Sequence, residues 1–185
     1  YFCFSIILLL SFYYVTNESF EVNDNKVKKK NLVFTSAGDN TNFDNLWCNS
    51  NKNYDVWVVY YGKNENNYNK YKSKVDFILK RKGSKFQNFH YIYNKYRNEL
   101  DKYERFFILD DDIIIDTDEI NRMFEISKKY NLWLCGPTFK NDGSGKISHE
   151  ITKQVPNNFL RYCNFVEVNV PLFNKYALNK LMNFY

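Results

Sequence analysis

The stretch FFILDDDIIID, residues 106–116, joins an apolar run to three consecutive acids, Asp110, Asp111 and Asp112. An apolar run without alternation indicates a strand that is covered on both faces, as in a parallel sheet flanked by helices. Adjacent carboxylates at the end of such a strand repel one another unless a cation or hydrogen-bond donors face them. The sequence therefore predicts a buried strand that ends in an acidic site.

Three apolar runs of the same kind precede this stretch. They are NLVFTSAGD (31–39), YDVWVVYYG (54–62) and VDFILKRKG (75–83). A helical period follows Ser84, which is a suitable N-cap residue. A second helix is predicted to begin at Asp116 or Thr117, with Glu119 completing a capping box. This alternation of strands and helices predicts an α/β fold with a mainly parallel central sheet.

Farther along, the pattern predicts strands in NLWLCGP (131–137), ISHEIT (147–152) and NFVEVNVP (164–171), a loop in KNDGSGK (140–146), and an amphipathic helix over residues 174–185. The spacing of Cys48, Cys135 and Cys163 matches no zinc-binding pattern. Two of these cysteines form a disulfide in a secretory lumen, or all three are free thiols; the sequence leaves both alternatives open.

The composition narrows the function classes. With 185 residues and 44% hydrophobic content, the chain supports one domain with a core and excludes general disorder. Lys and Arg number 26 against 21 Asp and Glu, a net charge of +5. This mild excess suits an anionic ligand such as phosphate. It is too small and too scattered to predict a nucleic-acid partner.

The first 15 residues, YFCFSIILLLSFYYV, carry no charge. At about 1.5 Å per helical residue, such a run is shorter than a hydrocarbon core of about 30 Å, so it indicates a signal-peptide core or part of a signal anchor. Because the chain begins with Tyr1 and not Met, we expect further residues upstream. The alternative is a buried element of the domain. Residues 16–30 are polar and predict a stem, which places the folded domain at 31–185.

The acids have a predicted place and partner. Ligands of open α/β sheets collect outside the carboxyl ends of strands, where these acids fall. In an extended chain, Asp110 and Asp112 point the same way and Asp111 points away. Two carboxylates form half of a site for Mg²⁺ or Mn²⁺, which water and substrate phosphates usually complete. The alternative is a solvated turn whose acids cap backbone amides.

FILDDDI resembles the Asp-x-Asp motif of nucleotide-sugar glycosyltransferases with the GT-A fold. A longer ordered set, KGSKFQNFHYIYNKY, FILDDDIIIDTDEINRMFEISKKYNLWLCGPTF, ISHEIT and CNFVEVNVPLF, resembles the uncharacterised glycosyltransferase-like family labelled "lysine ketoglutarate reductase trans-splicing related" over about residues 31–185. The resemblance implies a GT-A-like nucleotide-diphospho-sugar transferase sandwich. It also implies truncation at the C-terminus, because relatives continue with a Gly-Trp-Gly-x-Asp-like segment and a late His. Nothing in these residues reads RNA.

The resemblance further implies residue roles. Asp110 would face the ribose or donor sugar, and Asp112 would bind the divalent cation that bridges the diphosphate, with Asp110 as a second ligand. Asp111 stands where many relatives carry Glu. A nucleotide would lie beside the end of the first strand, where small residues let it approach the backbone. These positions are Thr35, Ser36, Ala37, Gly38 and Asp39.

Three further sites carry open alternatives. Gly83, Ser84 and Lys85 would contact the diphosphate at a helix N-terminus, or Lys85 is an ordinary surface lysine. His149 is a metal or phosphate ligand, or a structural hydrogen-bonding group. Glu167 lies in an apolar run, where it pairs with a cation such as that of Arg161 or faces the acceptor as a catalytic base.

The leading hypothesis is a metal-dependent glycosyltransferase of the hexosyltransferase type. It moves a sugar from a nucleotide-diphosphate sugar to a hydroxyl of a glycan or protein acceptor, in the Golgi or ER membrane, with Mn²⁺ or Mg²⁺ as cofactor. One alternative is a non-catalytic or truncated GT-A-like binding or structural domain. Another is a Mg²⁺-dependent phosphohydrolase, which needs more converging acids or histidines than this chain offers.

Overall fold

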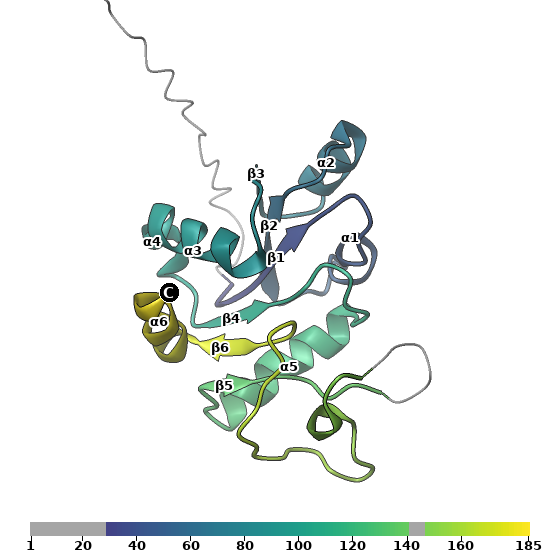
Figure 1. Ribbon diagram of the computed structural model, residues 1–185, viewed down its shortest axis with the longest axis vertical. Helices are drawn as coiled ribbons and strands as arrows, with labels where there is room; N and C mark the ends of the chain where they lie inside the picture. Colours follow the sequence, from purple (N-terminus) through teal and green to yellow (C-terminus); the bar gives the residue numbers. More distant parts are fainter. Residues whose placement is uncertain (1–28, 141–146) are drawn as a thin grey trace, which may run out of the picture.

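The computed structural model describes residues 29–140 and 147–185 as an α/β fold around a six-stranded sheet (Figure 1). The strand order is β3-β2-β1-β4-β6-β5. Its strands are β1 (Asn31–Ala37), β2 (Tyr54–Tyr60), β3 (Phe77–Lys80), β4 (Arg105–Ile108), β5 (Leu134–Cys135) and β6 (Leu172–Asn174). The first four run parallel, whereas β6 is antiparallel to both of its neighbours. The predicted α/β class and mainly parallel sheet are confirmed.

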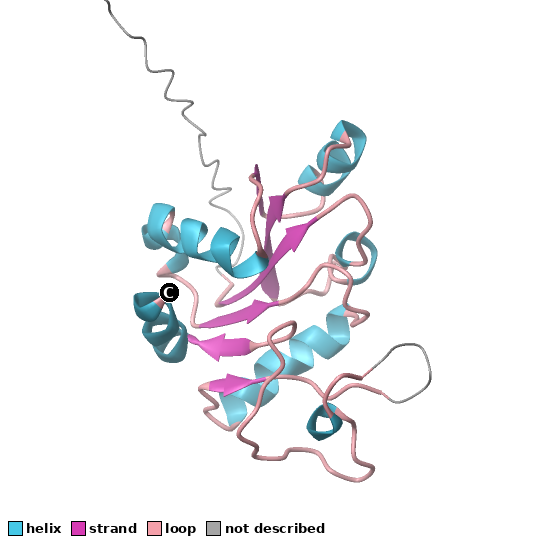
Figure 2. Ribbon diagram, in the orientation of Figure 1, coloured by secondary structure: helices cyan, strands magenta, loops and turns pink. Residues whose placement is uncertain are grey.

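Helices cover the sheet on both faces (Figure 2). One face packs against α3 (Lys85–Lys95), α4 (Arg97–Leu100) and α6 (Lys175–Phe184). The other packs against α1 (Phe43–Leu46), α2 (Glu65–Lys72) and α5 (Thr117–Lys129). Along β1, Leu32 and Phe34 belong to the first layer and Val33 to the second. Burial on both faces explains why these strands are apolar without alternation.

Local capping signals start the two helices that the sequence predicts best. The Ser84 side chain accepts a hydrogen bond from the Gln87 main-chain N–H, and the Gln87 side chain accepts one from the Ser84 N–H. Asp116 and Glu119 form the same reciprocal capping box at α5. Both predicted caps are confirmed, and Asp116 has a structural role. The predicted helix at 174–185 is confirmed as α6.

Two predicted strands are wrong. ISHEIT (147–152) contains a short 3₁₀ helix, η1 (Glu150–Thr152), and NFVEVNVP (164–171) is irregular until β6 begins at Leu172. NLWLCGP forms only the two-residue strand β5. A short apolar run becomes a strand only where a neighbouring strand accepts its hydrogen bonds, and periodicity does not reveal the neighbour. The sequence also missed the short helices α1 and α2.

The predictions for the apolar segment 1–15, for the stem up to residue 28, and for loop positions 141–146 lie outside the described residues. Within 29–140 and 147–185, no helix is both long and apolar enough to cross a membrane. Cys48, Cys135 and Cys163 are free thiols, which answers the disulfide question for these residues. Burial raises the pKa of the Cys48 and Cys135 thiols to about 11.

Candidate functional site

The acids lie where the sheet reverses its winding. From β1 the chain proceeds to β2 and β3 on one side, and then β4 pairs with β1 on its other side. In open α/β sheets such a switch point, at the carboxyl ends of the strands, forms the ligand crevice. Here it brings the loop after β1 against the acids after β4, because Asn42 N–H donates to the Asp111 carbonyl oxygen over 2.8 Å.

Asp111 faces the β1 loop. Its Oδ2 accepts a hydrogen bond from Gly38 N–H at 2.8 Å. Burial is the main cause that raises the pKa of the Asp111 carboxyl, and the charges of Asp112 and Asp110 add to it. Asp111 thus points toward the β1 loop, while Asp110 meets Lys85 and Asp112 borders a different pocket. The chain turns at Asp111 and Asp112, so the alternation of an extended strand does not apply there.

Asp110 lies on the side of α3. Its Oδ1 is 2.8 Å from Lys85 Nζ, which also donates to the Val168 carbonyl oxygen over 2.7 Å. Burial lowers the pKa of Lys85, and the bond to Asp110 opposes that shift. A pocket of about 440 Å³ opens here. It is lined by Ser84, Lys85, Phe86, Asp110, Val168 and Tyr185, and we call it the lysine pocket.

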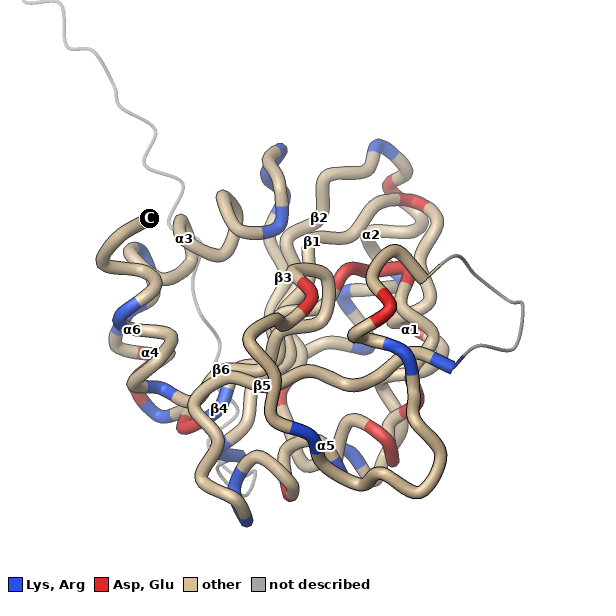
Figure 3. The backbone as a smooth tube through the Cα atoms, turned by 60° about the horizontal axis from the view of Figure 1, so that its bottom comes forward, with Lys and Arg blue, Asp and Glu red and all other residues tan. Residues whose placement is uncertain are grey.

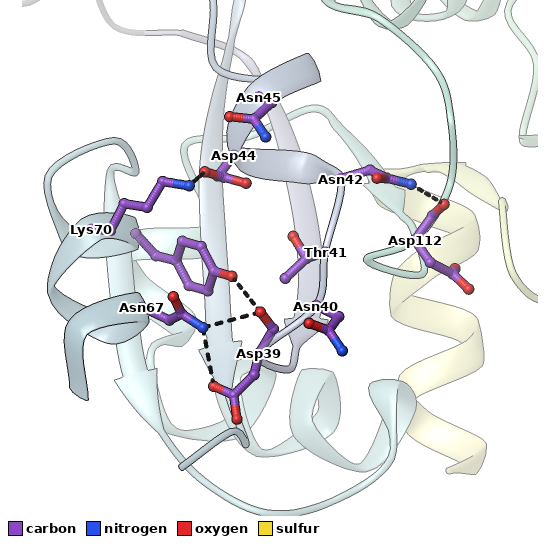
Figure 4. A pocket seen from close by; sticks show the side chains of 10 residues that line it. Asp39, Asn40, Thr41, Asn42, Asp44, Asn45, Asn67, Lys70 and Asp112 are labelled. Atoms are coloured by element: carbon purple, nitrogen blue, oxygen red, sulfur yellow. Dashed lines mark hydrogen bonds and ion pairs between the residues drawn. The ribbon is translucent and has the colours of Figure 1, made fainter. Parts of the chain in front are cut away.

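Asp112 borders a different pocket of about 450 Å³, here called the amide pocket (Figure 4). The Asn42 side-chain amide donates to the Asp112 carbonyl oxygen over 2.6 Å. The lining residues are Asp39, Asn40, Thr41, Asn42, Asp44, Asn45, Asn67, Lys70, Tyr71 and Asp112. Asp110 and Asp112 thus line separate pockets on two sides of Asp111, which corrects the prediction that they converge.

Asp39 orders the loop that follows β2. Its carboxylate accepts hydrogen bonds from the Tyr60 hydroxyl and, at 3.2 Å each, from the Lys63 and Asn64 N–H groups. The Tyr60 hydroxyl is the main cause that lowers the pKa of Asp39. Asp39 therefore forms one wall of the amide pocket while most of its hydrogen-bonding capacity is used internally.

The other predicted nucleotide contacts of the first strand lie inside the fold. Thr35, Ser36, Ala37 and Gly38 are all buried. Ser36 Oγ accepts a hydrogen bond from the Asn88 side-chain amide at 2.9 Å, which ties β1 to α3. These residues are buried beneath the crevice, and the first exposed residue beside it is Asp39.

Asn88 also organises the Gly83–Lys85 segment. Its amide donates to the Gly83 carbonyl oxygen over 3.1 Å, and its side-chain oxygen accepts from the Arg81 guanidinium. A Cβ at Gly83 would lie 2.6 Å from that oxygen, so only glycine fits there without a shift. Ser84 is engaged as the N-cap of α3. Of the three predicted diphosphate contacts, only Lys85 carries a charged side chain, and its ammonium group contacts Asp110.

Tyr61 is a site residue that sequence reasoning missed. A Cβ at Gly38 would lie 3.0 Å from the Tyr61 hydroxyl, so the tyrosine ring lies over that glycine. Burial raises the pKa of Tyr61, and the charges of the three acids, Asp111 first, add to it. Its position directly after β2, at the carboxyl edge of the sheet, is the signal that could have found it.

His149 and Glu167 form a pair on the connection between β5 and β6. His149 Nδ1 is 2.5 Å from Glu167 Oε1. The Glu167 side chain is 11% exposed and that of His149 is 52% exposed. Arg161, the partner considered for Glu167, instead donates to the Ile151 and Lys153 carbonyl oxygens. Both acid and histidine lie on irregular chain and a 3₁₀ cap, where strands were predicted.

The donor set can be tested for a divalent cation. In the ranges 29–140 and 147–185, no three His, Cys, Asp or Glu side chains converge as ligands. Mg²⁺ needs only one or two protein carboxylates, because water and phosphate oxygens complete its shell. Asp112 is exposed and supplies hard oxygen ligands, whereas Asp110 is paired with Lys85. The residues therefore fit such a cation at an open half-site.

Charges elsewhere are dispersed. Among residues 29–140 and 147–185, Lys and Arg positions are spread over several elements (Figure 3). Comparison of the chain with protein-family models, curated proteins and solved structures finds no match. The function is therefore inferred from the site itself.

Proposed function

We propose that this domain is a metal-dependent glycosyltransferase of the GT-A-like type, with a nucleotide-diphosphate sugar as donor and a glycan or protein hydroxyl as acceptor. The observation that carries the proposal is the placement of three acids at the switch point between β1 and β4, with a pocket on each side. A donor of this kind has a polar nucleoside at one end and a sugar at the other. The diphosphate between them would meet the acids.

The amide pocket suits the nucleoside. Amide side chains both donate and accept hydrogen bonds, as base edges and ribose hydroxyls do. Within the described parts of the chain, the side chains of Asn40 and Asn45 form no hydrogen bond, so their amides are available to a ligand (Figure 4). Asp44 in the same wall is already paired with Lys70 at 2.6 Å. The pocket therefore offers mainly neutral polar groups.

The chemistry follows from the charges. Mn²⁺ or Mg²⁺, when bound, supplies positive charge that stabilises the diphosphate leaving group. Asp112 would hold the cation, and Lys85, paired with Asp110 in the lysine pocket, provides a second positive charge on the other side of the acidic turn. Glu167, bonded to His149, is the candidate proton acceptor for the attacking hydroxyl. The proposed Golgi or ER membrane location rests on the sequence of residues 1–15 alone.

The variant Asp112→Asn tests the proposal. We expect the wild-type melting temperature to rise when Mn²⁺ and a nucleoside diphosphate are both present and to rise much less with either alone. Asp112→Asn removes the exposed carboxylate, so this joint stabilisation should be lost while circular dichroism stays unchanged. Glu125→Gln, an exposed acid of α5, is the matched control. Undiminished stabilisation of Asp112→Asn across a panel of nucleotides would remove Asp112 from the site.

One observation favours a second candidate, a GT-A-like domain that binds without catalysis. The charge of Asp110 is already neutralised by Lys85, as in a site that no longer needs a metal. In that case neither Mn²⁺ nor any nucleoside diphosphate of the panel stabilises the wild-type chain. The same melting experiment therefore separates the two candidates.

A further inference from the structure

Lys85, beside the acids, is largely buried and has two hydrogen-bonding partners. Its side chain is only 10% exposed, although it ends at a carboxylate that is 43% exposed. Nζ joins Asp110 Oδ1 at 2.8 Å and the Val168 carbonyl oxygen at 2.7 Å. A lysine held by two oxygen atoms with little water around it has a defined position, unlike a solvated surface lysine.

Asp110 is held in place as well. Its main-chain N–H donates to the Asn169 carbonyl oxygen over 2.9 Å, next to the residue whose carbonyl oxygen binds Lys85. The same segment, 168–169, therefore holds both the main chain of Asp110 and the Lys85 ammonium group. Lys85 cannot leave the pair without also giving up its hydrogen bond to the Val168 carbonyl oxygen.

Lys85 occupies the carboxylate of Asp110, which a divalent cation would otherwise use as a ligand. A cation bound to Asp110 would stand beside the charge of Lys85, and like charges at such distances repel strongly where water is scarce. The lysine pocket beside the pair gives Lys85 an alternative, because an anionic group there can take the place of Asp110 as its partner. An exchange of partners would satisfy all the charges.

We propose that Lys85 is the resident counter-ion of Asp110 and competes with divalent metal for it, so that metal binds this carboxylate fully only when an anionic ligand in the lysine pocket draws Lys85 away. The ligand class, a diphosphate, rests on the proposed function. The competition between Lys85 and metal does not, because it requires only the pair itself. Lys85 is then a positioning residue that couples metal binding to donor binding.

Mn²⁺ binding to the nucleotide-free chain tests the competition, with calorimetry as the readout. Lys85→Gln keeps a donor for the Val168 carbonyl oxygen but removes the charge, and we expect Mn²⁺ affinity to increase about tenfold, at the lower end of what one neighbouring charge does. Lys85→Arg retains the charge and should bind Mn²⁺ as weakly as the wild type. Lys82→Gln removes an exposed charge from the adjacent turn and should change the affinity less than about twofold.

A double variant shows whether the effect passes through Asp110. In an Asp110→Asn background, the added Lys85→Gln substitution should no longer strengthen Mn²⁺ binding. Equal or weaker Mn²⁺ binding by folded Lys85→Gln, or the same gain in the Asp110→Asn background, would overturn the inference. If Lys85→Gln does not fold, Lys85→Met provides the same test of the charge.

The outcome is independent of the nucleotide. If no nucleoside diphosphate binds any variant while Lys85→Gln still gains Mn²⁺ affinity, the proposed function fails and the competition stands. If nucleotides bind but Lys85→Gln shows no gain, the competition fails and the proposed function stands.

Discussion

The parallel half of the sheet and the connection between β5 and β6 are held together in different ways. Strands β1 and β2 are buried along nearly their whole length, between two layers of helices. Residues 147–171 of the connection carry exposed apolar side chains such as Val168 and Tyr162, at 66% and 82% exposure. Their contacts include one short 3₁₀ helix, the His149–Glu167 pair, side-chain hydrogen bonds from Arg161 and Lys85 to carbonyl oxygens, and a few backbone hydrogen bonds.

The region that stabilises the fold therefore differs from the region that contributes to the candidate site. The parallel half contains the large buried aromatic side chains, whereas the connection supplies Val168 to the lysine pocket. Regions with few buried apolar contacts open at low free-energy cost, and ligand-binding segments are commonly drawn from them. Substitutions in the two regions should therefore differ in size and in kind.

The largest effect is expected at Trp57. Its side chain is 1% exposed, and its ring meets that of Tyr103 at 5.9 Å between centroids. Trp57→Ala leaves a cavity in a core that cannot collapse fully, so the free energy of unfolding should fall by about 3–5 kcal/mol. Urea unfolding measures it, with Tyr162→Ala in the connection as the control, expected within about 0.5 kcal/mol of the wild type. Equal losses in both variants would break the comparison.

A smaller effect is expected at Glu167. Glu167→Gln keeps an acceptor for His149 but removes the charge of the pair. Because His149 is half exposed, the free energy of unfolding should fall by only about 0.2–1 kcal/mol. Urea unfolding at neutral pH measures the change. A loss as large as that of Trp57→Ala would mean that the connection is part of the stabilising core.

The smallest effect is expected at Asp111 and only as a function of pH. Burial raises the pKa of its carboxyl above the ordinary value of 3.8, so the folded state holds this proton more tightly than the unfolded state. The stability that comes from the protonated form is present below that ordinary pKa and is lost as pH rises through the raised pKa.

The variant Asp111→Asn isolates the pH dependence of stability that comes from the Asp111 carboxyl. It cannot ionise, yet its side-chain oxygen can still accept the hydrogen bond from Gly38 N–H. Its free energy of unfolding, relative to the wild type, should therefore increase as pH rises from about 4 toward neutrality. Thermal or urea unfolding over this range gives the difference. A difference that stays constant with pH would show that Asp111 is not desolvated in the folded state.

The parallel half was predictable because its signals are local. Unbroken apolar runs mark doubly covered strands, and Ser84 and Asp116 mark helix starts through their own side chains. Hence the carboxyl-edge location of the acids could be predicted from the sequence.

The connection and the details of the site were not predictable in the same way. Residues 164–171 resemble a strand in composition, but whether they pair along their length depends on β4, more than 50 positions earlier. The side-chain directions of Asp110 and Asp112 depend on the turn at residues 111–112, which strand periodicity does not predict. The Lys85–Asp110 and His149–Glu167 pairs join segments far apart in the chain, so no spacing rule reveals them.

The backbone bonds beside β4 also bear on when the site is assembled. Ile108 N–H donates to the Pro171 carbonyl oxygen, and Asp110 N–H donates to the Asn169 carbonyl oxygen. The acidic turn therefore contacts residues that are synthesised some 60 positions later. During synthesis, the four parallel strands are available well before that second neighbour leaves the ribosome. The scaffold can thus form first, and the acids acquire their final setting only after residues 169–171 have been synthesised.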